Sequence, residues 1–163
     1  MNIVTTDNRW IGQRTIRPDG VDKVTGRAAF AADTTMPGMI WGKVLRSPHA
    51  HARIKSIDTS KAEALPGVKA VVTSRDIVEF PLDKSVMLGI QDMRWMCRNV
   101  MAREKALFPG HPVAAVAAIS EAIAAHACTL IEVDYEVLPW SIEIDDALKP
   151  DAPNMHEFMK FEG

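Results

Sequence analysis

The stretch GMIWGKVLRSPHAHARIKSID, residues 38–58, decides the fold of this chain. Its first part, residues 39–45, is largely apolar, as expected of a strand. The serine and proline that follow end this strand, because proline cannot donate a hydrogen bond to a strand ladder. Residues 53–57 predict a second strand. The turn between the two strands holds two histidines, His49 and His51.

This turn is also the first candidate site. His49 and His51 are two positions apart, which puts both side chains on one side of an extended segment, a spacing that metal sites use. Ser47 and His49 combine a nucleophile with a base, but no G-x-S-x-G elbow surrounds them. Arg46 and Arg53 flank the turn. The simpler interpretation is a polar turn whose histidines and arginines hold backbone carbonyls or a neighbouring chain.

Other candidate groups are more scattered. Three further histidines could complete a metal site, or act as a base in one case, namely His111, His126 and His156. An acidic stripe and a methionine cluster could bind a hard and a soft cation, respectively; they are Glu132, Asp134 and Glu136, and Met87, Met93, Met96 and Met101. A solvated strand face and gap-filling methionines are the commoner explanations of these two groups. Glycine-rich nucleotide loops and C-x-x-C pairs do not occur in the sequence.

Composition limits the function classes. The 163 residues suit one domain with a real core, and 47% of them are hydrophobic. The net charge of -2 gives no field that would attract nucleic acid or a membrane surface. Two cysteines, Cys97 and Cys128, are too few for an iron–sulfur cluster, and we expect free thiols in a reducing cytoplasm.

Strands and helices alternate without a regular βαβ repeat. The pattern predicts strands at residues 28–31, 39–45, 53–57, 68–73, 105–108, 112–119, 132–137 and 142–144. It predicts helical segments after Asp58, after Ser74, from Ser120 and at residues 145–148, and a long connection over residues 80–101. The fold class is therefore α+β, with at least two helices packed on a mixed sheet.

The same blocks resemble a known family. The opening stretch followed by ALPGVKAVVTSRDI, then FPGHPVAAVAA and LIEVDYEVLP, with VDKVTGRAAFAAD as the lead-in, is similar to the N-terminal hammerhead domain of the xanthine dehydrogenase and aldehyde oxidase (molybdenum hydroxylase) family. The resemblance runs from Ile11 to His156. It implies an α/β-hammerhead domain at residues 18–150 and the start of a linker to a molybdopterin-binding domain at residues 151–163. The sequence of residues 1–17 itself predicts a loosely ordered segment.

The resemblance also implies a place in a larger cytoplasmic enzyme. In that family the molybdopterin cofactor lies on the rest of the same subunit, and FAD and [2Fe–2S] clusters lie on partner domains or subunits. The full enzyme hydroxylates an aromatic heterocycle or an aldehyde. The family's pterin-binding segments and catalytic glutamate match no position here, so no catalytic, cofactor-binding or metal-binding residue is assigned.

Three functional hypotheses follow. The first is a scaffold domain that is inactive alone and whose exposed apolar surface would favour self-association. The stop at Gly163, within what the family uses as a linker, favours a piece of a longer protein over a separate small subunit. The second is a stand-alone binding or assembly module that reuses the fold without redox chemistry. The third is a metal enzyme built on His49 and His51.

Overall fold

The structure, a computed structural model, describes residues 12, 14, 16–78, 87–88 and 91–156, and the side chains among them except those of residues 87–95. The chain divides into two compact units, Met1–Pro37 and Gly38–Gly163. Each is described by itself. Most of the segment predicted to be loosely ordered, residues 1–17, and half of the predicted linker start, residues 151–163, lie outside the described residues.

The first unit contains two short helical turns. They are α1 (Gly20–Val24) and the 3-10 turn η1 (Ala31–Asp33). The strand predicted at residues 28–31 is therefore wrong. The Asp33 carboxylate accepts a hydrogen bond from the Phe30 N–H at 2.9 Å, and this local bond closes a turn in place of an extended segment.

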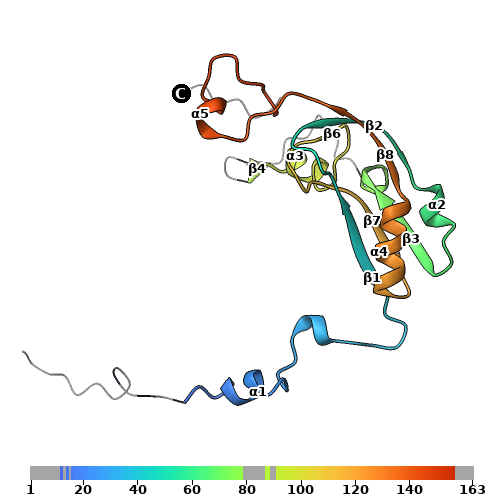
Figure 1. Ribbon diagram of the computed structural model, residues 1–163, viewed down its shortest axis with the longest axis vertical. Coiled ribbons are helices and arrows are strands. Elements are labelled where there is room, and N and C mark those ends of the chain that lie inside the picture. The colour runs from blue at the N-terminus through green and yellow to red at the C-terminus, as the bar shows by residue number, and fades with distance from the viewer. Residues whose placement is uncertain (1–11, 13, 15, 79–86, 89–90, 157–163) are drawn as a thin grey trace, which may run out of the picture. The chain divides into compact units, whose positions relative to one another are not determined.

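Two three-stranded sheets form the second unit (Figure 1). The β7 sheet has the order β1-β7-β3, with β1 (Trp41–Arg46), β7 (Pro112–Ala118) and β3 (Val68–Thr73). The β2 sheet has the order β6-β2-β8, with β6 (Lys105–Ala106), β2 (Ala52–Asp58) and β8 (Glu132–Val137). A small ribbon pairs β4 (Met87–Leu88) with β5 (Gln91–Asp92).

The α+β class is confirmed. The sequence prediction places the helices on one mixed sheet, whereas the structure has separate sheets. Every strand pair among the described residues is antiparallel. A parallel pair needs a crossover connection within one sheet. Here the one long helical connection, from β7 to β8, leads from one sheet to the other, so it creates no parallel neighbours.

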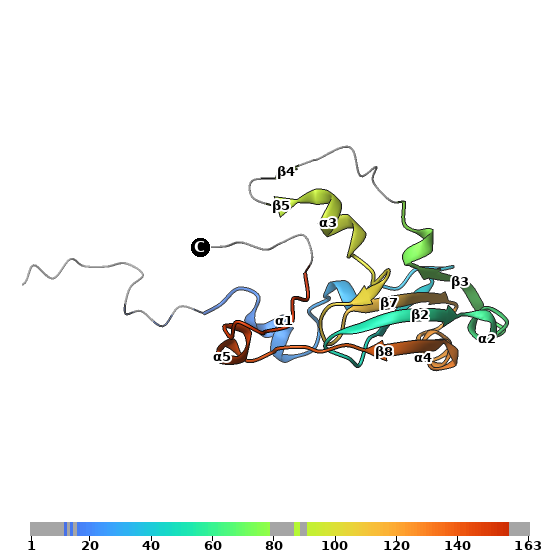
Figure 2. The same cartoon turned by 90° about the horizontal axis from the view of Figure 1, so that it is seen from above.

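The helices of this unit vary in length and role. They are α2 (Ser60–Glu63), the 3-10 turn η2 (Ser74–Asp76), α3 (Met93–Arg98), α4 (Glu121–Leu130) and α5 (Ile144–Ala147). Two of them pack as predicted, since α4 lies on β1 and β7, and α2 lies on β3 and α4. Figure 2 shows both on the same side of β7. Within the described residues, no helix has the length and apolar character needed to cross a bilayer.

Two predictions about connections are wrong. The segment predicted as a long connection, residues 80–101, contains α3 and the β4–β5 ribbon in its described part. The strand predicted at residues 142–144 is absent, because α5 already starts at Ile144, with Glu143 at its N-cap position. The helix predicted at residues 145–148 corresponds to α5.

Small residues bring α4 close to the β7 sheet. The buried cluster contains Ala114 and Val116 from β7 and Ala127, Cys128 and Ile131 from α4 and its end. Alanine on both surfaces lets the helix backbone approach the strands, as the alanine-rich β7 sequence predicts. Ser120 caps α4, with its hydroxyl accepting a hydrogen bond from the Ile123 N–H at 3.3 Å.

Gly67 lies in the turn before β3, where both the backbone conformation and the packing against α4 favour glycine. Its φ is +95°, and a Cβ added there would lie 2.9 Å from Cδ1 of Ile123. We expect Gly67→Ala to lower the free energy of unfolding by about 2 kcal/mol, since the alanine pays for both the left-handed backbone and the contact. Urea denaturation checks this value. Gly26→Ala is the matched control, because Gly26 has a φ of +73° but nothing within 4 Å of an added Cβ. Equal losses in the two variants would contradict the packing argument.

Candidate functional site

Ser47 is held in the backbone of the turn. It is 3% exposed. Its N–H donates to the His111 carbonyl at 2.9 Å, and its carbonyl accepts from the Gly110 N–H at 2.8 Å. Its hydroxyl oxygen accepts from the His49 N–H at 3.1 Å. The same hydroxyl donates to the His49 carbonyl at 3.2 Å, so both bonds hold the turn together.

His51 joins the start of β2 to the segment that follows β8. Its Nδ1 lies 2.7 Å from the Pro139 carbonyl oxygen, which can only accept, so Nδ1 carries the proton and donates. The His51 carbonyl accepts from the Leu138 N–H at 3.0 Å. The ring is buried, and Nε2 has no hydrogen-bond partner among the described residues. His51 therefore clamps two chain segments together.

His49 has a different neighbour. Its half-buried ring meets the Tyr135 ring edge to face, with centroids 5.0 Å apart and planes inclined at 71°. Burial raises the pKa of Tyr135, and a hydrogen bond with Ser47 opposes this rise. Across the described part of the chain, no group of three or more His, Cys, Asp or Glu side chains is arranged to hold a metal ion. The structure does not place His111, His126 or His156 as a third ligand beside the two turn histidines.

His111 is the most strongly engaged histidine. It is 0% exposed. Its Nδ1 accepts from the Leu107 N–H at 3.2 Å, and its Nε2 lies 2.8 Å from the Asn99 carbonyl, to which it donates. Its ring stacks on Phe108 with centroids 4.4 Å apart. Burial lowers the pKa of His111, so the ring is neutral at pH 7 and serves as a two-sided hydrogen-bonding link.

The charged residues around the turn are also used structurally. Arg46 donates to the Gly110 carbonyl at 2.9 Å, and Arg53 lies 3.4 Å from the carboxylate of Glu136, its partner across the β2–β8 ladder. Glu132, in the stripe considered for cation binding, forms an ion pair with Lys61. This stripe therefore faces basic residues of this chain.

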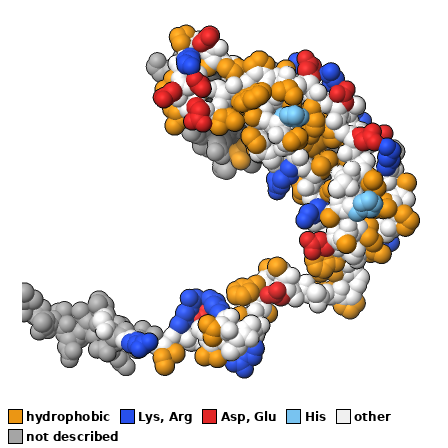
Figure 3. All heavy atoms as spheres, viewed as in Figure 1, with side chains coloured by type: hydrophobic (Ala, Val, Ile, Leu, Met, Phe, Trp, Pro, Cys, Tyr) orange, Lys and Arg blue, Asp and Glu red, His pale blue; other side chains and the backbone are white. Residues whose placement is uncertain are grey.

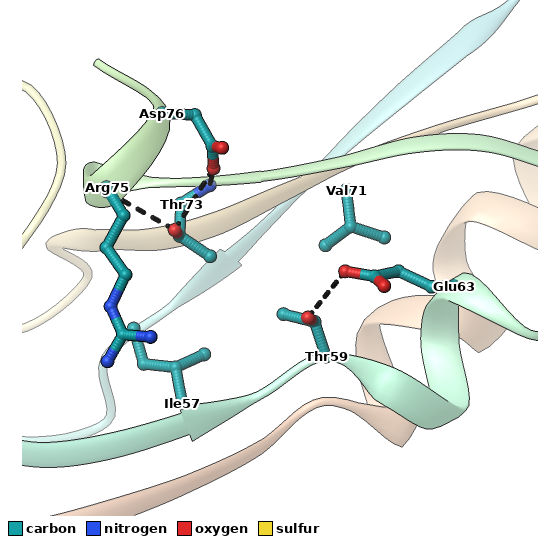
Figure 4. Close-up of a pocket in the computed structure, with 7 residues that line it drawn as sticks. All are labelled: Ile57, Thr59, Glu63, Val71, Thr73, Arg75 and Asp76. Atoms are coloured by element: carbon teal, nitrogen blue, oxygen red, sulfur yellow. Dashed lines mark hydrogen bonds between the residues drawn. The ribbon is translucent and has the colours of Figure 1, made fainter. Parts of the chain in front are cut away.

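A small polar cavity lies between the ends of β2 and β3 (Figure 4). Its volume is about 190 Å³, and its lining consists of Ile57, Thr59, Glu63, Val71, Thr73, Arg75 and Asp76. Sequence reasoning did not find it. Its two carboxylates are engaged, since Glu63 accepts from the Thr59 hydroxyl at 2.6 Å and Asp76 accepts from the Thr73 N–H at 2.7 Å, a bond that lowers the pKa of Asp76. Both threonine–carboxylate pairs are local, and they stabilise the starts of α2 and η2.

The two cysteines are free thiols. Cys97 is half-buried on α3, and Cys128 is buried on α4. Burial raises the pKa of the Cys128 thiol. Its sulfur lies 3.7 Å from the Lys43 carbonyl. Cys128 therefore acts as a small core residue, with little thiolate at neutral pH.

Comparison with known proteins identifies a family, which the geometry of the candidate site alone does not. Residues 25–139 match the family described as aldehyde oxidase and xanthine dehydrogenase, a/b hammerhead domain. The chain is 43% identical over 150 residues to the carbon monoxide dehydrogenase large chain of Afipia carboxidovorans, covering 92% of this chain and 18% of that relative. It is 41% identical to one subunit of a probable xanthine dehydrogenase of Bacillus subtilis, with coverages of 87% and 18%.

Solved structures of related enzymes contain the same fold. A crystal structure of a Cu,Mo-CO dehydrogenase superimposes with a TM-score of 0.73 at 40% identity, covering 93% of this chain and 18% of that one. The aldehyde oxidoreductase of Desulfovibrio gigas gives a TM-score of 0.70 at 31% identity, with coverages of 87% and 16%. The chain thus spans less than a fifth of the length of these four proteins.

Proposed function

The chain belongs to the aldehyde oxidase and xanthine dehydrogenase a/b hammerhead domain family, and from this premise we propose that it is a structural, inter-domain part of the large subunit of a molybdenum-dependent oxidoreductase. The observation that carries the proposal is the coverage, because the match fills 92% of this chain but only 18% of the carbon monoxide dehydrogenase large chain. A small domain beside a much larger remainder of the large subunit favours a structural role for the small domain. The full enzyme hydroxylates an aromatic heterocycle or an aldehyde.

The candidate side chains support the absence of catalysis by this chain alone. Ser47, His51 and His111 each bond to backbone groups and hold strands and loops together. None of these three residues lines the polar cavity between β2 and β3. The proposal therefore assigns them to positioning the domain's own segments.

The polar cavity between β2 and β3 does not fit the molybdopterin cofactor. The polar cavity has a volume of about 190 Å³, and its two carboxylates already accept hydrogen bonds from threonines. Pockets for cofactor-sized ligands are larger, about 300–1,000 Å³. In the proposal the molybdopterin lies on the remainder of the same subunit, FAD and the [2Fe–2S] clusters lie on partner subunits, and no step of the chemistry is assigned to this chain.

Exposed apolar side chains support an inter-domain role. Beyond β8, Ile142 is 65% exposed, and Ile144 and Leu148 are each 77% exposed. Figure 3 shows hydrophobic side chains gathered at the α5 end of this unit. Such a surface favours association with another domain, or self-association when the domain is alone. A cytoplasmic location completes the proposal, and the two free cysteines support it.

Two measurements test the proposal. The purified 163-residue chain is expected to be folded by circular dichroism, to contain far less than one molybdenum atom per chain by mass spectrometry of metals, and to show no hydroxylase activity with a dye acceptor. Stoichiometric molybdenum would overturn the proposal.

The second measurement replaces the matching region of the Afipia carboxidovorans carbon monoxide dehydrogenase large chain with this chain. We expect the chimera to assemble with its partner subunits, as judged by size-exclusion chromatography. A chimera that never assembles, although the isolated chain folds, would favour the stand-alone binding module.

A further inference from the structure

One face of the β7 sheet is left open. Side chains alternate between the two faces along β7, so Ala114 and Val116, which belong to the core cluster, point toward α4. Ala115 and Ala117 point to the opposite face. Figure 2 shows α4 and α2 on one side of this strand.

The strand register identifies the residues of this opposite face. Ala115 pairs with Val44 of β1 and with Val72 of β3, and paired residues in an antiparallel ladder point to the same side. In the next row Ala117 pairs with two further residues in the same way. The open face is therefore Gly42, Val44, Ala70, Val72, Ala115 and Ala117.

The open face is apolar and exposed. Val44 is 41% exposed and Val72 is 36% exposed. Gly42 and Ala70 are also exposed, and the two alanines of β7 are half-buried. An antiparallel sheet covered by helices on one face normally carries polar side chains on the other. The outer side of β8, with its three acidic residues, follows that rule. None of the six residues of the open face has a polar or charged side chain, and charge enters at its margins, with Arg46 at the end of β1 and Lys69 at the bulge of β3.

This composition indicates a permanent neighbour. Obligate interfaces are more hydrophobic than transient ones and exclude charge from their centre. No side chain on the open face is larger than valine, so it presents a flat surface against which a second layer can approach closely. A complementary layer would project larger aliphatic or aromatic side chains into the space above the alanines and glycine.

We propose that the remainder of the large-subunit polypeptide packs on the open face as a second layer, an inference that rests on the proposed function. The polypeptide that could cover the open face is large, because this chain covers only 18% of the carbon monoxide dehydrogenase large chain. The partner surface is an apolar, uncharged layer. Docking there buries the face that the domain alone leaves exposed.

Thiol labelling tests the open face directly. Val44→Cys places a thiol on it, and Lys43→Cys is the matched control, since Lys43 is the adjacent strand residue on the α4 side and its side chain is 49% exposed. Both are made with Cys97→Ser, which removes the half-buried native thiol. Maleimide modification at residue 43 or 44 is followed by peptide mass spectrometry in the isolated chain and in the chimeric large chain.

In the isolated chain both thiols are expected to react. In the assembled chimera, Val44→Cys is expected to react at least tenfold more slowly while Lys43→Cys keeps its rate. Equal rates at residue 44 in both proteins, or equal protection of both thiols, would overturn the proposal. Protection of Val44→Cys that grows with the concentration of the isolated chain would overturn it in favour of a second copy.

Failure of the proposed function gives a different result. Assembly of the chimera is checked by sizing before any labelling, and a chimera with the natural Val44 that does not assemble counts against the proposed function itself. An assembled chimera in which residue 44 stays reactive counts against the open face alone.

Discussion

Replacing His111 with alanine is expected to lower the free energy of unfolding by about 4 kcal/mol. The ring is fully buried and bonds to two backbone groups, the Leu107 N–H and the Asn99 carbonyl. Alanine would leave both groups without this partner and would remove the stack on Phe108. Urea denaturation followed by circular dichroism measures the loss.

Two control variants isolate the hydrogen bonds. Glutamine can both accept and donate, so His111→Gln should retain about half of the stability that alanine loses. His126 lies exposed on α4, and His126→Ala should change the free energy of unfolding by less than about 0.5 kcal/mol. A loss below about 1 kcal/mol for His111→Ala would show that the link is not important for stability.

The same histidine predicts a pH dependence with a definite sign. Burial lowers the pKa of His111 below its ordinary value of 6.5, so at mildly acidic pH the unfolded chain binds a proton that the folded chain does not. The contribution of neutral His111 is thus fully present above pH 6.5 and is lost as the pH falls toward the folded-state pKa.

Comparison with His111→Gln removes the titration of the other histidines. The difference in free energy of unfolding between the natural chain and this variant should shrink as the pH falls below 6.5. For one proton the slope cannot exceed about 1.4 kcal/mol per pH unit. A difference that grew on acidification would contradict the assignment of a neutral, buried ring.

Helices and strands could be predicted where a local sequence pattern specifies them, and not where distant backbone groups do. The bounds of β3 and β8 match the prediction, because a β-branched run after Pro66-Gly67 and a strictly alternating segment are local patterns. In contrast, α3 is not predicted, although Asp92 directly precedes it and Met93, Met96 and Cys97 fall at i, i+3 and i+4. A helix of six residues is too short for such a period to stand out. The role of His111 depends on the Asn99 and Leu107 backbone groups, and every residue carries such groups, so no side-chain pattern could announce it.

The β7 sequence contains a further signal that has meaning only beside the structure. PVAAVAA is apolar at every position, as in strands buried on both faces. Among the described residues α4 covers one of those faces along residues 114–118, and on the other face Ala115 and Ala117 are only half-buried, whereas Val113, at the irregular start of the strand, is fully buried. The uniform pattern therefore agrees with the open face as a surface to be buried, and adjacent residues of β7 should tolerate charge very differently.

Ala114→Asp is expected to lower the free energy of unfolding by about 5 kcal/mol or more, which would unfold a domain of ordinary stability. Ala114 is 0% exposed and lies in the cluster between β7 and α4, where a carboxylate would lose its water without gaining a cation. Circular dichroism at 25 °C should show loss of the folded signal. Ala114→Ser adds a small polar group without charge, and it should cost only about 1–2 kcal/mol.

Ala115→Asp is the matched variant on the other side of the same strand. Ala115 is half-buried on the open face, so water can reach the new carboxylate, and the loss in the isolated chain should be about 1 kcal/mol, mostly from the poor strand propensity of aspartate. In the chimeric large chain the same charge would lie against the second layer, so this variant of the chimera should not assemble. If Ala114→Asp and Ala115→Asp destabilised the isolated chain equally, the two faces of β7 would be equally covered, and no open face would exist for a second layer to bury.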